Sequence, residues 1–422
     1  MNAAPTSLHR PPFISTFLSH SSADKALVEA VAQRLGRRGV LAWLDKNELL
    51  EMGTLDTLLK QAVQQQATLT LFLSEAFLKS EWCKDELKWA IEAETGIDHL
   101  LPVYLGSPLT LVKGHPLLRS RFLHPDGDKV NKLGYTCRQD LAEPDADAIA
   151  DKIAATVYRR SIPEPWSEVV IVLDQRGDGP RRGFPTLPSN VADLNEPILT
   201  FRPNLEHRQR KGILTGTDWD DMVTTMVQSL SLALGTVRGE SRKVRVLGNA
   251  QAGLLWAVGR HFDRTTSADL YSYGQDDVAV TNKNQNRHSP LSGGDQNKAK
   301  RIPSEAKSLV TNQPIVALGV GSQKKYGTAV RQSIPDLPLF WLECESIKDS
   351  EQAMQLVADM VASVERLRRE YGTRELVLFW TTANHVVPLA AANLTTHVIP
   401  KIKFMEWDHA KGQYVHLSMP GD

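Results

Sequence analysis

Short runs of β-branched and aromatic residues alternate with longer amphipathic segments through the first third of the chain. A strand that is followed by a helix and then by a neighbouring strand pairs in parallel, because the helix returns the chain to the starting edge. The spacing of apolar residues therefore predicts an α/β domain, with a parallel sheet wrapped by helices. Strands are expected at 13–18, 40–44, 68–73 and 101–105, and helices around 27–35, 55–63, 81–94 and 145–160.

Polar residues mark the start of the first of these helices. Ser21 and Asp24 have the spacing of a capping box, in which the serine hydroxyl accepts a hydrogen bond from a backbone N–H of the first turn. We therefore expect Ser21 to cap this helix. A polar loop is expected at 45–53, whereas the stretch 107–143 has no clear periodicity.

The last two-fifths of the chain contain a weak internal repeat of elements. Each copy predicts helix, strand, helix and strand, which favours two fused α/β halves over a single sheet. The first copy covers 219–234, 244–247, 250–261 and 269–273, and the second covers 350–369, 376–380, 385–394 and 401–407. Two prolines in 161–166 indicate a linker, so the expected domains are 10–160 and 165–422. The segment 282–301, rich in Asn, Gln, Lys and Gly, is expected to be a mobile loop.

Charge and cysteine content exclude several classes of protein. The 422 residues contain 49 Lys and Arg and 49 Asp and Glu, and this balance disfavours electrostatic binding of long nucleic acid. The three cysteines, Cys83, Cys137 and Cys344, are too far apart for a disulfide framework or a Cys-x-x-Cys metal site. No apolar run approaches the length that spans a membrane. We therefore expect a cytoplasmic protein with no metal, no cofactor and no membrane partner.

The sharpest local pattern is the segment SEWCKDEL at 80–87. On a helix, Trp82 and Glu86 lie one turn apart, so a carboxylate shares a stripe with an aromatic ring. Two interpretations follow from the spacing. Glu86 is either a charged residue at the edge of an apolar stripe that reaches to water, or a carboxylate held in place for chemistry.

The segments FISTFLSHSSAD, VLAWLDKNELLEMG, LTLFLSEAFLKSEWCKDEL and LLPVYLG, in this order, resemble a TIR domain. The resemblance covers about 12–106, and the closing helix extends it to about 160. It implies a flavodoxin-like fold and gives Glu86 the role of catalytic carboxylate in cleavage of NAD⁺ to nicotinamide and linear or cyclic ADP-ribose. NAD⁺ is then a substrate. Ser19, His20 and Ser21 are candidate phosphate contacts, Trp82 is a further candidate substrate contact, and Trp43 is either a platform for a substrate ring or core packing.

Some TIR domains are adaptors that only assemble with other TIR domains, and the loop at 45–53 occupies the position of their assembly loop. In enzymatic relatives the same loop of a neighbouring chain completes the active site. The resemblance therefore implies self-association, and it leaves a non-enzymatic scaffold as the alternative function.

The segments KVRVLGNAQAGLLWAVGRHF and ELVLFWTTANHVVPLAAANL resemble the paired strand–turn–helix units of SAVED domains, which consist of two halves similar to CARF folds. This resemblance implies a bacterial antiphage (CBASS) effector that senses a cyclic oligonucleotide, such as cyclic tri-adenylate, made by a partner nucleotidyltransferase (CD-NTase). Ligand binding is expected to drive head-to-tail oligomers or filaments. A mononucleotide or a peptide is the alternative ligand.

Ligands of open α/β units bind beyond the carboxyl ends of the strands, where polar turns lead into helices. The candidate ligand-binding residues are those in or after such turns. They are Asn249, Gln251, Thr381, Thr382, Asn384, Lys324, Lys325 and Arg202. The alternative for the Asn and Thr residues is helix capping, and for the charged residues it is simple solvation.

Overall fold

A computed structural model describes most of the chain. The described residues are 13–44, 68–92, 100–130, 134–137, 145–175, 187, 191, 196–203, 213–235, 242–262, 268–273, 279–281, 314–344, 347, 349–394, 401–408 and 411–419. The predicted loops at 45–53 and 282–301 and the predicted helix at 55–63 lie outside these residues. Within the described part, no helix is both long enough and apolar enough to cross a lipid bilayer.

The chain divides into two compact units. The first contains Met1–Pro165 together with Gly179–Thr186 and Pro197–Leu205, and the second contains the remaining segments up to Asp422. The first unit thus includes two pieces that follow the expected linker in sequence.

The first unit is built on a parallel sheet in the order β2-β1-β3-β4-β5, which confirms the predicted α/β architecture. The chain moves from β1 to one side and then returns to the other side of β1 to form β3, which places a topological switch point between these two strands. The strands are β1 (Ser15–Ser19), β2 (Leu41–Trp43), β3 (Leu69–Leu73), β4 (Leu100–Tyr104) and β5 (Tyr135–Thr136).

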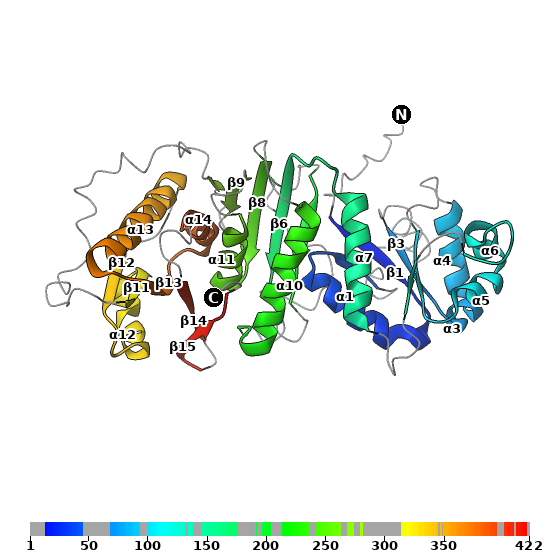
Figure 1. The fold of residues 1–422 in the computed structure, drawn as a ribbon, viewed down its shortest axis with the longest axis horizontal. Coiled ribbons are helices and arrows are strands. Elements are labelled where there is room, and N and C mark those ends of the chain that lie inside the picture. The colour runs from blue at the N-terminus through cyan, green and yellow to red at the C-terminus, as the bar shows by residue number, and fades with distance from the viewer. Residues whose placement is uncertain are drawn as a thin grey trace, which may run out of the picture. The chain divides into compact units, whose positions relative to one another are not determined.

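Helices cover both faces of this sheet (Figure 1). On one face, α1 (Lys25–Arg37) and α7 (Ala146–Ser161) pack together, and Arg38 binds Asp151 at 2.7 Å and Asp147 at 3.2 Å. The other face carries α3 (Glu75–Lys79), α4 (Glu81–Glu92), α5 (Pro108–Lys113) and α6 (Pro116–Phe122). The core on that face includes Phe17, Leu71, Phe77, Leu87 and Phe122.

The predicted capping box is wrong. A 3₁₀ turn, η1 (Ser22–Asp24), precedes α1, and the Ser21 side chain does not cap it. The Ser21 hydroxyl instead donates to the Asp24 carboxylate, with 2.5 Å between the two oxygens. The hydroxyl proton thus bonds a carboxylate, which makes a stronger hydrogen bond than a neutral acceptor does.

The strand β7 (Ile198–Phe201) packs with the first unit. The Thr200 N–H donates to the Gly39 carbonyl at 2.9 Å, and the Arg202 N–H donates to the Gly36 carbonyl at 2.7 Å. Gly39 has φ +75°, and a Cβ there would lie 2.9 Å from the Phe201 ring. The turn after α1 thus requires glycine both for its backbone conformation and for this close approach.

Within the second unit, four strands of its first half lie in the order β10-β9-β8-β6, with the β8 pairs parallel and the β9–β10 pair antiparallel. They are β6 (Glu168–Asp174), β8 (Arg242–Asn249), β9 (Ala268–Tyr273) and β10 (Ala279–Thr281). Among the described residues, this half has the helices α10 (Gly216–Leu234) and α11 (Ala252–His261).

The second half has a five-stranded sheet in the order β12-β11-β13-β14-β15, parallel except for the last pair. Val330 of α12 and Ile334, which directly follows this helix, pack on one face beside Trp341. Tyr371 of α13 contacts Phe340, which points to the other face. The elements are β11 (Ile315–Gly321), α12 (Gln323–Ser333), β12 (Leu339–Glu343), α13 (Ser350–Tyr371), β13 (Glu375–Thr381), η6 (Asn384–Val386), α14 (Val387–Asn393), β14 (Lys401–Asp408) and β15 (Gln413–Leu417).

The predicted repeat of two α/β halves is confirmed, and its corresponding helices α11 and α14 pack directly on each other. Gly259 makes this contact possible, because a Cβ at this position would lie 2.2 Å from the Pro388 carbonyl oxygen and 2.8 Å from the Ala391 Cβ. The Arg260 guanidinium donates to the Leu394 carbonyl, which ties the end of one helix to the end of the other.

Substituting Gly259→Ala is therefore expected to destabilise the second unit by about 1–3 kcal/mol, because the added methyl meets backbone atoms that cannot turn away. Gly327→Ala in α12 is the matched control. Its Cβ would meet the flexible Gln323 side chain at 3.1 Å, and a helix-interior alanine is favoured by up to about 1 kcal/mol. Urea unfolding measures both variants, and equal stability of the two would contradict the packing described for α11 and α14.

Candidate functional site

The carboxyl ends of β1 and β3 define the place where a ligand of the first unit is expected to bind. In open α/β sheets, ligands bind outside these ends at the topological switch point, because the adjacent loops diverge there. Ser19 is the last residue of β1 and pairs in register with Leu71, while Ser74 directly follows β3.

Glu86 of α4 points its carboxylate at this edge of the sheet. Its side chain is 5% exposed. The Trp82 indole N–H donates to Oε1 of Glu86 at 2.7 Å, and the Ser19 hydroxyl donates to Oε2. Ser19 and Phe17 are two positions apart on β1, so their side chains point to the same face of the sheet. On that face, Phe17 packs in the core below α4. The two donors therefore hold both carboxylate oxygens in one orientation and stabilise the negative charge.

The loop after β1 is fixed by a second set of hydrogen bonds. The Cys83 thiol of α4 donates to the His20 carbonyl at 3.4 Å, and Nδ1 of His20 lies 2.9 Å from the Leu18 carbonyl. Asp24 accepts from the Ser21 hydroxyl and, at 2.7 Å, from the Ser74 hydroxyl. This loop is thus joined to the helix that carries Glu86 and to the loop that follows β3.

Ser74 also starts α3. Its hydroxyl oxygen accepts from the Phe77 N–H at 3.0 Å while the hydroxyl donates to Asp24. Sequence reasoning missed Asp24 and Ser74 as members of this region, because the Ser21–Asp24 spacing was attributed to a capping box. The available signal was Ser74 itself, a good N-cap residue at the carboxyl end of a buried strand.

The two predicted aromatic residues lie on the same face as Glu86. Trp43 pairs in register with Phe17, and both Trp43 and Trp82 are partly buried against the core that contains Phe17. Trp82 also meets Trp89 of α4 edge to face, with ring centroids 6.3 Å apart. Core packing is therefore a function of both tryptophans, and both remain partly exposed.

The predicted residues of the second unit divide into two groups. Thr381 and Thr382 follow β13, and Lys324 and Lys325 are exposed in the first turn of α12, after β11. Since β11 and β13 are adjacent parallel strands, these four residues share one carboxyl edge. The Thr381 hydroxyl donates to the Val320 carbonyl at 2.9 Å.

The second group lies where the two halves meet. The Asn384 side-chain amide donates to the Ala250 carbonyl at 3.2 Å, which joins the polar turns of the two repeats. The neighbouring Gln251 is fully buried, and its side-chain oxygen accepts from Gln175 and, at 2.7 Å, from the Leu214 N–H. Gln251 thus makes structural hydrogen bonds within the first half.

Arg202 and Asn249 stand apart from these groups. Arg202 follows β7 and packs beside Gly36 in the first unit, whereas the residues predicted with it belong to the second unit. Asn249 ends β8 and pairs in register with Asp174. The Asn249 side chain lies outside the described residues.

A carboxylate that was not predicted from the sequence lies near the Gln251 turn. Glu406 of β14 accepts from the Gly253 N–H at 3.2 Å, in the first turn of α11. A carboxylate at a helix N-terminus is favoured by the helix dipole. This contact also joins the two halves of the second unit.

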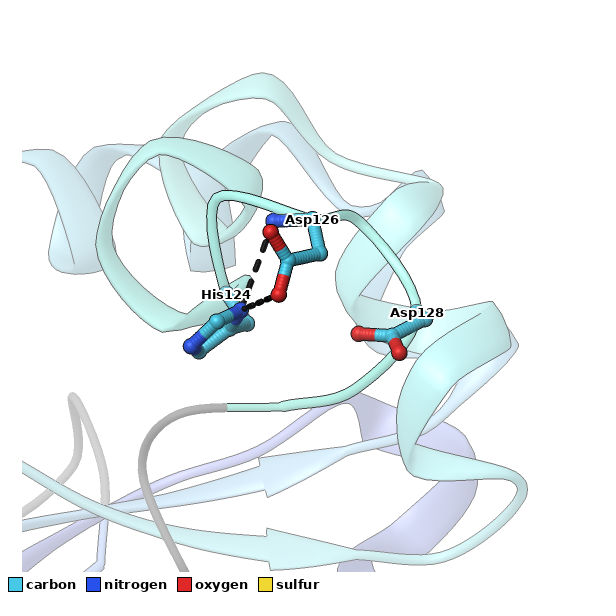
Figure 2. Close-up of side chains that lie close together, drawn as sticks. All are labelled: His124, Asp126 and Asp128. Atoms are coloured by element: carbon cyan, nitrogen blue, oxygen red, sulfur yellow. Dashed lines mark hydrogen bonds and ion pairs between the residues drawn. The ribbon is translucent and has the colours of Figure 1, made fainter.

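His124, Asp126 and Asp128 form the one group of potential metal ligands among the described residues (Figure 2). They lie on a turn after α6, where Nδ1 of His124 is 2.8 Å from an Asp126 carboxylate oxygen. The Gly127 N–H donates to the His124 carbonyl at 2.8 Å, with Gly127 at φ +72°. The tight turn itself thus brings these side chains together.

Comparison with known protein families finds a match within the first unit. The family model of the TIR domain matches residues 16–133, a range that includes Ser19, Trp43, Trp82 and Glu86. No curated protein matches the chain.

Two solved structures of the Acinetobacter baumannii Cap4 SAVED/CARF-domain containing receptor are similar to this chain. The complex with 2'3'3'-cAAA has 12% identity and a TM-score of 0.42, and the complex with 3'3'3'-cAAA has 13% and 0.43. Each match covers 83% of this chain and 80% of the receptor. The Moraxella osloensis Cap4 receptor has 10% identity and a TM-score of 0.39, covering 87% of this chain and 85% of its own.

The thiol of Cys83 tests the packing around Glu86. Burial raises its pKa to about 11, and the negative charges of Glu86 and Asp24 act in the same direction. At pH 8 the thiolate fraction is then about a hundredfold lower than for a thiol with an unshifted pKa. Burial also raises the pKa of Cys137 to about 11.

We expect iodoacetamide at pH 8 to modify the half-buried Cys344 well before Cys83 and Cys137. Peptide mass spectrometry measures the order, and protein unfolded in urea is the control in which all three react. Modification of folded Cys83 as fast as Cys344 would contradict the description of the site.

Proposed function

We propose that this protein is an antiphage effector whose first unit cleaves NAD⁺ to nicotinamide and ADP-ribose when its second unit binds a cyclic oligonucleotide. The observation that carries the proposal is the carboxylate of Glu86, buried at the switch point of a TIR-type sheet and held on both oxygens. NAD⁺ is the substrate, and the cyclic oligonucleotide is the activator.

The chemistry needs one carboxylate. The nicotinamide leaves as a neutral base, because its ring nitrogen carries the positive charge before the bond to ribose breaks. A general acid is therefore not required, in contrast to ordinary glycoside hydrolysis with its two carboxylates. Glu86 accepts hydrogen bonds from the ribose hydroxyls and stabilises the positive charge that develops on the ribose as the bond breaks.

The architecture of the second unit supports a nucleotide-sensing role. Two α/β halves pack through α11 and α14, and a hydrogen bond from Asn384 to the Ala250 carbonyl joins their polar turns. Lys324 and Lys325 lie exposed at the carboxyl edge of the second sheet, where their charge favours phosphates. A compact ring of phosphates suits these local cations and the zero net charge of the chain.

Activation proceeds through self-association. Ligand binding favours head-to-tail packing of second units, and a heterologous contact that does not close yields a filament. The loop at 45–53 of one copy then completes the site around Glu86 of its neighbour. The activator is supplied by a nucleotidyltransferase of the CD-NTase class, and cyclic tri-adenylate is the first ligand to test.

Release of nicotinamide from NAD⁺ tests the proposal directly, with and without a panel of cyclic di-, tri- and tetranucleotides. We expect release with one activator, and Glu86→Gln should lower the rate at least about a hundredfold because the stabilising charge is lost. Glu81→Gln is the matched control. This glutamate lies on the same helix, but its side chain is 84% exposed. The control should retain the wild-type rate.

Binding without cleavage would contradict the enzymatic proposal and favour the non-enzymatic TIR scaffold. Thermal shift measures binding independently of activity, because a ligand at a hundred times its Kd stabilises the native state by about 2.7 kcal/mol. A shift with mononucleotides or peptides and none with cyclic oligonucleotides would contradict the proposed activator.

Lys324 and Lys325 allow a test of the proposed ligand site at the carboxyl edge of the second sheet. The double substitution Lys324→Gln and Lys325→Gln is expected to weaken activator binding about tenfold or more, since two charges that favour phosphate are lost. Lys401→Gln is the control, because this exposed lysine begins β14 at the amino edge of the same sheet. Isothermal titration with cyclic tri-adenylate measures both, and equal Kd values would remove this edge from the proposed binding site.

A further inference from the structure

Ser19 was expected to contact substrate, but its surroundings indicate a different role. The side chain is 1% exposed, and its hydroxyl donates to Oε2 of Glu86. A group so deeply buried offers no surface to a substrate phosphate. Its hydroxyl faces the reactive carboxylate from the side of the sheet.

The hydrogen bonds of the Glu86 carboxylate come from two independent elements. Trp82 is one turn earlier on the same helix, so its donation to Oε1 moves with Glu86. Ser19 belongs to β1, whose register with β3 is fixed by backbone pairing. Ser19 is therefore a donor that fixes the carboxylate relative to the sheet.

The loop after Ser19 is itself tied to the sheet and to α4. The His20 carbonyl accepts from the Cys83 thiol, and Asp24 joins the Ser21 and Ser74 hydroxyls across the switch point. These contacts restrict movement of the β1 end towards or away from Glu86. The position of the Ser19 hydroxyl is thus determined before a substrate binds.

We infer that Ser19 is a positioning residue, which orients the Glu86 carboxylate and favours its charged form for the cleavage of the nicotinamide–ribose bond. The inference rests on the proposed NAD⁺ cleavage. A hydroxyl that donates to a carboxylate stabilises the ionised state over the protonated state. Ser19 thus acts through Glu86, and NAD⁺ contacts other groups.

Steady-state kinetics of activated Ser19→Ala separate this role from substrate binding. We expect kcat to fall about tenfold while KM for NAD⁺ stays within about twofold, because a hydrogen bond to a charged group is lost but no substrate contact is. In the pH–rate profile, the acidic limb, where the rate falls as pH is lowered, should also move to higher pH. Ser22→Ala is the matched control, since Ser22 lies exposed in the same loop, and it should behave as wild type.

A raised KM with an unchanged acidic limb would overturn the inference, because it would identify Ser19 as a substrate contact. Wild-type kinetics for Ser19→Ala would overturn it as well. If Ser19→Ala does not fold, Ser19→Cys keeps a weak donor of similar size and should move the limb by a smaller amount. An unmoved limb in a folded Ser19→Cys enzyme with full kcat would again overturn the inference.

A readout without NAD⁺ separates this inference from the proposed function. The ¹³C-labelled side-chain carboxyl of Glu86, assigned by its loss in Glu86→Gln, is titrated by NMR in wild type and in Ser19→Ala. We expect its midpoint to lie at higher pH in the variant. An absence of nicotinamide release from wild type would defeat the proposed function, whereas an unshifted midpoint would defeat the role of Ser19.

Discussion

A buried carboxylate must find hydrogen-bond donors within the fold. Removing a carboxylate from water is costly unless donors replace the lost hydration, and for Glu86 the donors are an indole N–H and a serine hydroxyl. Trp82 is available because α4 places it one turn before Glu86. Ser19 is available because β1 ends at the switch point of the sheet, opposite that helix.

The strand order thus does more than enclose a core. It brings the loop after β1 and the start of α3 together at one carboxylate, Asp24, and leaves Glu86 beside them. In the second unit, the packing of α11 against α14 brings the polar turns of the two repeated halves together. A ligand that contacts either turn therefore acts on a structure that both halves share.

Periodicity and spacing were sufficient to predict the parallel sheet, the position of Glu86 one turn after Trp82, and the repeated halves of the second unit. Periodicity and spacing did not predict which hydrogen-bond partner a polar side chain has in the fold. Ser21 was expected to cap a helix but donates to Asp24. Asp24 also accepts from Ser74, 50 residues further along the chain, and Ser19 donates to Glu86, 67 residues away. Local sequence does not show these long-range hydrogen bonds. Gln251 is similar, since its burial against Leu214 arises from tertiary packing.

The central claim is that occupancy of the second unit controls chemistry at Glu86. The most direct measurement titrates cyclic tri-adenylate while bound ligand and the rate of nicotinamide release are followed in the same samples. We expect negligible release of nicotinamide without ligand and a rate that rises with occupancy until the sites are full. Saturated binding with no change in rate, or a full rate in the absence of ligand, would contradict it.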